Sequence, residues 1–155
     1  MFHFRRNCKK YVAALISLAL ILSMSITSFA ATTSYGPYQS TKKLSVALLP
    51  GTSGTTYEAA TINVTANVTV SKIKVETTTY SHNGNPIIVR GFYVTSPSAN
   101  TYYVPVSSGQ AGTSYAFSGE SAYGTWTVLV DCECLTGIYT GYSSSTYKPT
   151  KITIN

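Results

Sequence analysis

Three residues of the kinds that form hydrolytic sites occur in this 155-residue chain: Ser114, His82 and Asp131. A serine becomes a nucleophile only when a histidine takes its proton, an acid orients that histidine, and an oxyanion hole binds the developing charge. Beyond residue 30 the chain has one histidine and one aspartate, so a single set of these types is expected by chance. We therefore predict no catalytic residues and no enzyme activity, and we disfavour a small serine hydrolase.

The segment Cys132-Glu133-Cys134 holds two thiols with the spacing of neighbours on one face of a strand. In an extended chain their α-carbons lie about 6.6 Å apart, whereas a disulfide brings the β-carbons to about 3.8 Å. A structural zinc site usually has four Cys or His ligands, and only His82 could join the pair. We favour buried free thiols and no metal site. A disulfide is the alternative, because an exported chain can be oxidised.

Carboxylates are scarce, with five in the whole chain, of which Glu120, Asp131 and Glu133 are close in sequence. Calcium binds six to eight oxygens, usually including several carboxylates. Calcium is compatible with a secreted protein of this kind, but the sequence assigns no calcium site. We predict no cofactor.

Tyrosine is abundant, and twelve of the thirteen tyrosines lie beyond residue 30. An aromatic ring with a polar tip suits stacking on a sugar or contact with a protein. The candidate ligand-binding residues are Tyr102 and Tyr103 at the start of a predicted strand, and Tyr139, Tyr142 and Tyr147 in a Gly/Ser-rich stretch. The alternative is a half-buried structural role, because tyrosine favours strands.

The first 30 residues have the features of a secretory signal peptide. Basic residues at positions 5–10 precede an apolar run over residues 12–24, and Ser28 and Ala30 flank Phe29 as they would at a signal-peptidase site. The apolar run is shorter than the roughly 20 residues that span a bilayer. We predict cleavage after Ala30, a secreted extracellular protein, and no membrane partner after cleavage.

Cleavage would leave 125 residues with seven basic and five acidic side chains, a net charge of +2 against +6 for the full chain. This length fits one domain. We expect residues 31–42 to form a flexible leader and residues 43–155 a single domain. The small remaining charge removes the main reason to expect a nucleic-acid partner.

Alternating apolar and polar residues predict strands along the whole mature chain. Residues 61–70 alternate strictly, and the phase changes at Ser71, which predicts a bulge or bend there. Further strands are expected at residues 44–49, 87–95, 101–106, 114–117 and 151–154. Turns rich in Gly, Pro, Asn and Ser separate them, and no segment has a helical period. This pattern predicts an all-β fold, a sandwich or a barrel, and the family resemblance given below implies the antiparallel jelly-roll-like β-sandwich.

Residues 124–134 contain the only tryptophan of the chain. Because side chains of a strand alternate between its faces, Trp126, Val128 and Val130 share one face with the two cysteines. We expect this face to be structural core. Asp131 is expected on the opposite, outward face.

The order of several short motifs resembles the P domain of subtilisin-like proprotein convertases, over about residues 61–155. The motifs are Ser81-His82, Ser96-Pro97-Ser98, Phe117-Ser118-Gly119-Glu120, Gly124-Thr125-Trp126 and Val130-Asp131. The resemblance implies a jelly-roll sandwich without a catalytic centre, one that assists the folding, stability or substrate presentation of an enzyme. Here the module would be free-standing. Residues 112–116 also resemble the sequence around the nucleophile of subtilisin-like proteases, which is the source of the hydrolase alternative.

Together these features predict a secreted, non-catalytic β-sandwich module. Its expected partner is an extracellular protein or a cell-surface component, which it binds or stabilises. The alternative is a carbohydrate-binding module that uses the tyrosine-rich loops to hold a cell-surface polysaccharide.

Overall fold

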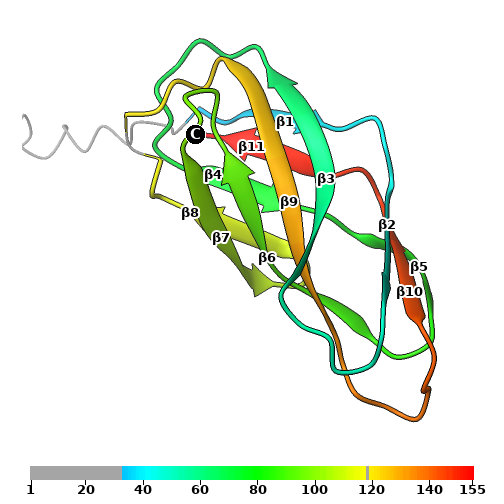
Figure 1. Cartoon of the computed structure of the whole chain (residues 1–155). Coiled ribbons are helices and arrows are strands. Elements are labelled where there is room, and N and C mark those ends of the chain that lie inside the picture. Colours follow the sequence, from blue (N-terminus) through cyan, green and yellow to red (C-terminus); the bar gives the residue numbers. More distant parts are fainter. Residues whose placement is uncertain (1–32, 118) are drawn as a thin grey trace, which may run out of the picture. The chain divides into compact units, whose positions relative to one another are not determined.

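The computed structural model describes residues 33–117 and 119–155 (Figure 1). The predicted signal peptide lies outside the described residues. The described part forms eleven strands: β1 (Tyr35–Gln39), β2 (Leu44–Leu48), β3 (Thr55–Val64), β4 (Ile73–Glu76), β5 (Thr79–Asn83), β6 (Ile87–Thr95), β7 (Thr101–Ser108), β8 (Ala111–Ser114), β9 (Gly124–Cys134), β10 (Ser143–Tyr147) and β11 (Lys151–Ile154). Nothing in that part is a helix of the length and apolar character that a membrane crossing needs.

The strands form two antiparallel sheets. The larger has the order β1-β11-β4-β8-β7-β6-β9-β3, and the smaller has the order β2-β10-β5. The edge strands β1 and β3 approach each other, so the larger sheet nearly closes on itself. The predicted all-β fold with antiparallel sheets around one core is confirmed.

Strand β9 runs through the centre of the core and lies between β6 and β3. Trp126, Val128 and Val130 are fully buried, as are Cys132 and Cys134 further along the same face. The indole Nε1 of Trp126 donates to the carbonyl oxygen of Ala122 at 2.8 Å. A buried indole whose N–H group has a hydrogen-bond acceptor contributes a large apolar area to the core.

Strand β1 occupies the segment for which we expected a flexible leader, residues 31–42. It pairs with β11, with Tyr35 opposite Ile154 and Tyr38 opposite Ile152. The two tyrosines pack against the core. The expectation of a flexible leader was therefore wrong for β1. Strand pairing and the burial of the two tyrosine rings hold this segment in place, although its polar sequence shows no alternation of apolar residues.

The alternation over residues 61–70 does not correspond to one strand. Strand β3 ends at Val64, and Val70 is buried from a connecting segment outside the strands. The phase change at Ser71 marks the passage of the chain to β4, which pairs with β8 and β11 rather than with the neighbour of β3. The expected strand over residues 114–117 likewise lies earlier, as β8.

Strands β5 and β10 were not expected from the sequence. They form the smaller sheet with β2, and β10 buries Ser143 and Ser145 instead of aliphatic side chains. A strand that buries serine gives no apolar alternation. This sheet positions the loop that carries the exposed tyrosines Tyr139 and Tyr142.

Candidate functional site

The three residue types of a hydrolytic site are not assembled into one. The side-chain oxygen of Ser114, on β8, accepts from the backbone amide of Ala116 at 3.2 Å. His82, on β5, places Nδ1 3.1 Å from the hydroxyl of Ser145, and Asp131 lies 3.3 Å from the hydroxyl of Tyr103. Within residues 33–117 and 119–155, no hydrogen bond joins any two of the three.

Cys132 and Cys134 are free and fully buried. Burial, with a smaller contribution from the charge of Asp131, raises the pKa of the Cys132 thiol from 9.0 to about 12. A thiol that holds its proton so firmly is a poor nucleophile and a poor metal ligand. In the part of the chain that the structure describes, no three His, Cys, Asp or Glu side chains form a group that could hold a metal ion.

Two of the five candidate ligand-binding tyrosines bond and pack within the fold, Tyr147 fully buried and Tyr102 half-buried. Tyr147 is fully buried, and its hydroxyl donates to the carbonyl of Ile87 at 3.3 Å, so a ligand contact for Tyr147 is wrong. Tyr102 packs its ring 4.3 Å from that of Phe117 and donates to Glu120 at 2.5 Å. Hydrogen bonds, above all from Tyr102, hold the pKa of Glu120 below its ordinary value. Both tyrosines stabilise the fold.

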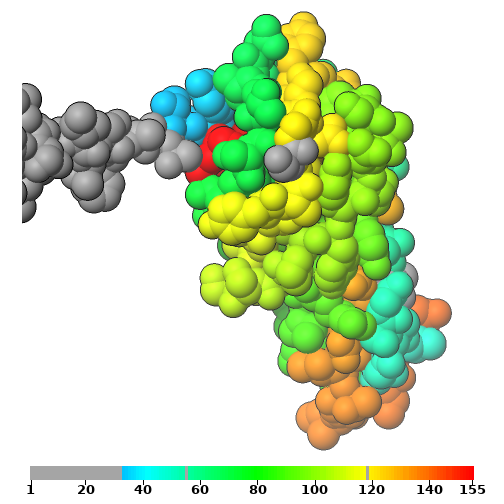
Figure 2. Space-filling model, turned by 90° about the vertical axis from the view of Figure 1, so that its left-hand side faces the viewer, coloured from blue at the N-terminus to red at the C-terminus, as the bar shows by residue number. Residues whose placement is uncertain are grey.

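Tyr139 and Tyr142 lie in the loop between β9 and β10, at one end of the sandwich (Figure 1). Together with the loop between β2 and β3, this loop forms what we call the tip, residues 49–54 and 135–142. Five large apolar or aromatic side chains of the tip are exposed: Leu49, Leu135, Ile138, Tyr139 and Tyr142. Ile138 is fully exposed and Tyr142 is 65% exposed. The tip has no charged residue. Its residues 135–142 protrude as the orange end in Figure 2.

The backbone of the tip is hydrogen-bonded to the end of β9 and to the turn between β5 and β6. The amide of Gly51 donates to the carbonyl of Cys134 at 2.9 Å, and the amide of Cys134 donates to the carbonyl of Thr52 at 2.8 Å. The amide of Leu135 donates to the carbonyl of Pro86 at 2.9 Å. Hydrogen bonds therefore fix both loops beside the end of β9.

Asn85 clasps the loop that carries the exposed side chains. Its Nδ2 donates to the carbonyl of Tyr139 at 2.6 Å, and its Oδ1 accepts from the amide of Tyr139 at 3.2 Å. The backbone amide of Asn85 donates to the hydroxyl of Ser143 at 2.7 Å. Asn85 is buried. It fixes the backbone of Tyr139 and leaves the ring free.

Two glycines allow this close approach. Gly84 has a positive φ of 89°, and a β-carbon there would come within 2.6 Å of the Ser143 hydroxyl. A β-carbon on Gly137 would overlap the side-chain amide of Asn85. Glycine is therefore required at both positions if the clasp is to form.

The tip combines exposed apolar side chains with an ordered backbone. Exposed apolar side chains gathered in one place mark an interaction site, in contrast to single ones scattered over a surface. Because the clasp already orders the loop, docking costs less conformational entropy than it would for a free loop. The sequence identified Tyr139 and Tyr142 by type and composition. It did not identify Asn85, which appeared only as part of a turn.

Tyr103 is exposed on a different part of the surface, the outer side of the larger sheet. It lies beside Asp131, which is on the face opposite Trp126 as expected. Asp131 is nevertheless buried on that face. The prediction of Asp131 as an outward acid is correct for its face and wrong for its exposure.

The chain matches no protein-family model and no curated protein. The P-domain resemblance therefore stays a prediction.

Three solved structures are similar to this chain at TM-scores below 0.5. The first is the crystal structure of a serine protease of Aeromonas sobria with its chaperone (ORF2), at a TM-score of 0.44 and 16% identity, covering 88% of this chain and 29% of that chain. The second is FLHE, at a TM-score of 0.40 and 12% identity, covering 73% and 94%. The third is the Aeromonas sobria serine protease, at 0.39 and 14%, covering 81% and 28%. This chain thus spans under a third of the length of the two protease matches.

Proposed function

We propose that this chain is a secreted, non-catalytic β-sandwich module that binds another extracellular protein through its tip. The observation that carries the proposal is the full exposure of Ile138 between Leu135 and Tyr139, on a loop that Asn85 holds in place. Export rests on the predicted signal peptide.

The chemistry of the tip favours burial against a partner. Apolar surface that leaves water stabilises a complex by about 25 cal/mol per Å². Tyrosine is enriched among the residues that contribute most to protein interfaces, and charged residues are depleted at interface centres. The tip has two exposed tyrosines, exposed aliphatic side chains and no charge.

A protein fits the tip better than a polysaccharide does. Leu49, Leu135 and Ile138 are aliphatic and offer no aromatic face for a sugar ring to stack on and no polar group for its hydroxyls. An apolar recess on a protein surface removes all of them from water. The tip would enter such a recess with a backbone that is already ordered before docking.

Site-specific photocrosslinking in the secreting cells tests this function. A benzophenone amino acid is placed at Ile138 and, as a matched control, at Tyr115, which is 72% exposed outside the tip. We expect a discrete crosslinked protein adduct from position 138 and none from position 115. Excess purified wild-type protein should suppress the adduct, and excess Ile138→Asp protein should not. Absence of an adduct at position 138, or equal adducts at both positions, would contradict the proposal.

A further inference from the structure

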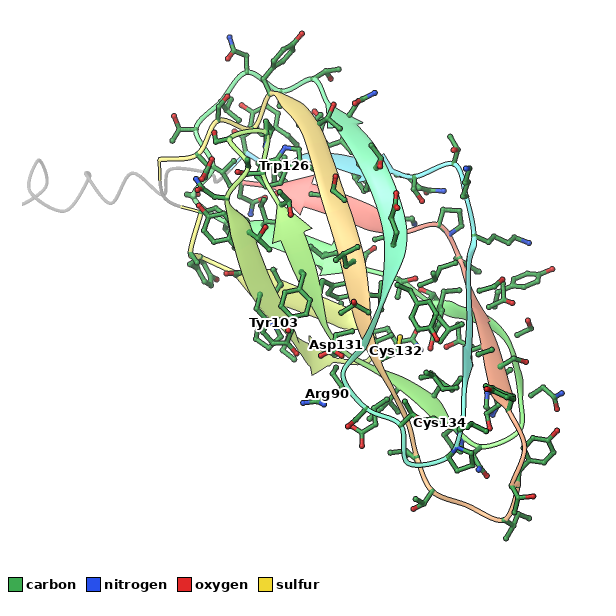
Figure 3. All side chains as sticks on the ribbon, viewed as in Figure 1. Arg90, Tyr103, Trp126, Asp131, Cys132 and Cys134 are labelled. Atoms are coloured by element: carbon green, nitrogen blue, oxygen red, sulfur yellow. The ribbon has the colours of Figure 1, made fainter. Side chains whose placement is uncertain are left out.

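A second group of side chains lies on the outer surface of β6, β7 and β9. We call it the tyrosine face: Tyr93, Tyr103, Arg90, Asp131 and Glu133. Figure 3 shows Arg90, Tyr103 and Asp131 gathered at one place on the larger sheet. None of these residues belongs to the tip.

The register of the strands brings the two rings together. Tyr93 and Tyr103 are directly opposite each other on β6 and β7, with ring centroids 4.9 Å apart and planes tilted by 55°. Gly91 lies opposite Asp131, and a β-carbon at Gly91 would come within 2.5 Å of the ring of Tyr103. The glycine therefore lets the ring of Tyr103 lie on the backbone of β6 and reach the carboxylate of Asp131.

The charged groups are close together but weakly bonded to one another. The register of β6 against β9 shifts between Val89 and Gly91, which leaves Arg90 as the extra residue. Its Nε lies 3.8 Å from Glu133 and 4.0 Å from Asp131, and its side chain is 44% exposed. Both distances exceed a hydrogen bond. The guanidinium is therefore near two carboxylates and still has donors to offer.

Asp131 lacks the hydrogen bonds that a buried carboxylate normally has. It is 5% exposed, and Oδ2 accepts from the hydroxyl of Tyr103 at 3.3 Å. No group among the described residues donates to Oδ1. Burying a charged oxygen without a donor is costly, and such groups are rare in folded proteins.

The hydroxyl of Tyr103 remains a donor at neutral pH. Burial and the neighbouring charge of Asp131 raise its pKa above the ordinary value. The cluster thus offers aromatic faces, a cationic donor and the half-exposed carboxylate of Glu133 within one patch, with Asp131 buried beneath Tyr103.

We propose that the tyrosine face is a carbohydrate-binding subsite, in which a sugar ring packs on Tyr103 and its hydroxyls bond Arg90 and Glu133. A sugar hydroxyl both donates and accepts, so it can donate to Glu133 and receive a bond from Arg90. The apolar side of a pyranose suits a tyrosine ring. A ligand ammonium group would suit the carboxylates and the rings but would be repelled by Arg90. This inference is independent of the tip and of its protein partner.

Nuclear magnetic resonance titration of the ¹⁵N-labelled protein tests the subsite, with cellohexaose, chitohexaose, mannohexaose and hexagalacturonate as separate probes. We expect at least one probe to shift the amides of residues 90–93, 103 and 131 in a saturable manner. Arg90→Ala and Tyr103→Ala should each weaken that probe at least about tenfold, which corresponds to ~1.4 kcal/mol. Tyr115→Ala, at an exposed tyrosine outside the face, should bind as the wild type does.

Two further titrations distinguish a sugar subsite on the tyrosine face from binding at the tip and from a cation site. Ile138→Asp should keep sugar binding, because the tip is not involved. Nα-acetyl-lysine methylamide should leave the amides of the tyrosine face unchanged. A saturable response to that lysine probe with none to the sugars would overturn the proposal in favour of a cation site. No response to any of the four sugars, or undiminished binding by Arg90→Ala and Tyr103→Ala, would also overturn it.

Discussion

At the Trp126 end of the sandwich, Tyr102 packs its ring 4.3 Å from Phe117 and gives its hydroxyl to Glu120. At the tip, Tyr139 is held by its backbone, through Asn85, and its ring is exposed. The sequence offers both residues as ligand contacts on the same grounds. The two tyrosines differ in which of their groups, side chain or backbone, is bonded to the rest of the fold. A tyrosine with its ring and hydroxyl engaged stabilises the protein, and one with only its backbone engaged is free to bind.

This contrast separates stability from binding along the molecule. Figure 3 shows Trp126 and Cys134 far apart along β9, the first within the main core and the second beside the tip. We expect substitutions near Trp126 to change the free energy of unfolding. Substitutions of exposed tip side chains should change partner binding alone.

The largest effect is expected for Trp126→Ala. The indole is fully buried and hydrogen-bonded to Ala122, and truncation of a core aromatic costs about 3–5 kcal/mol. Urea denaturation followed by far-ultraviolet circular dichroism measures the loss. A Trp126→Ala protein that is as stable as the wild type and has lost its partner would place Trp126 in the binding site instead of the core.

Alkaline pH should lower the free energy of unfolding through the buried thiol of Cys132. Because the folded protein raises the pKa of Cys132 from 9.0 to about 12, the thiol keeps its proton in the folded state and loses it in the unfolded state between these values. The free energy of unfolding therefore keeps its full value below pH 9. It decreases as the pH rises above 9, by up to about 1.4 kcal/mol per pH unit. Urea denaturation from pH 8 to pH 11 measures this slope.

Cys132→Ala provides the control for that slope, which should become shallower. Part of the slope should remain in this variant, because burial also raises the pKa of Tyr147. Iodoacetamide should label Cys132 in the unfolded protein and not in the folded protein at pH 8.5. Rapid labelling of the folded protein would show that the interior beside the tip is open.

A smaller effect is expected for Asn85→Ala. The substitution removes both side-chain bonds to Tyr139 and leaves the part-buried carbonyl of Tyr139 without its donor, which costs about 1 kcal/mol or more. Partner crosslinking from position 138 should fall as well, although no exposed side chain has changed. Asn83→Ala, at the exposed last residue of β5, is the matched control and should change neither. Loss of stability with unchanged crosslinking would show that the clasp does not prepare the loop for binding.

The sequence predicts the strands whose apolar residues alternate. Strand β9 and the burial of Trp126 follow from period two, as does the all-β fold. Strands β1, β5 and β10 could not be predicted in this way, because tyrosine, serine and threonine fill them. Ser143 and Ser145 are buried where a pattern based on hydrophobicity expects solvent.

The candidate site is predictable in its residue types and not in its arrangement. Tyr139 and Tyr142 can be named from composition. Their support comes from Asn85, which is 54 residues before Tyr139 in the chain, so no local pattern connects the two. Asp131 shows the same limit, because only the cross-strand position of Tyr103 accounts for the burial of an outward-facing acid.

Ile138→Ser tests the central claim most directly. The side chain is fully exposed, so we expect the free energy of unfolding to change by less than about 0.5 kcal/mol. The Ile138→Ser protein, added to the secreting cells as a competitor, should fail to suppress the crosslink that forms from the benzophenone at position 138. A stable Ile138→Ser protein that no longer competes is the predicted result. Undiminished competition by this protein would contradict the tip as the binding site.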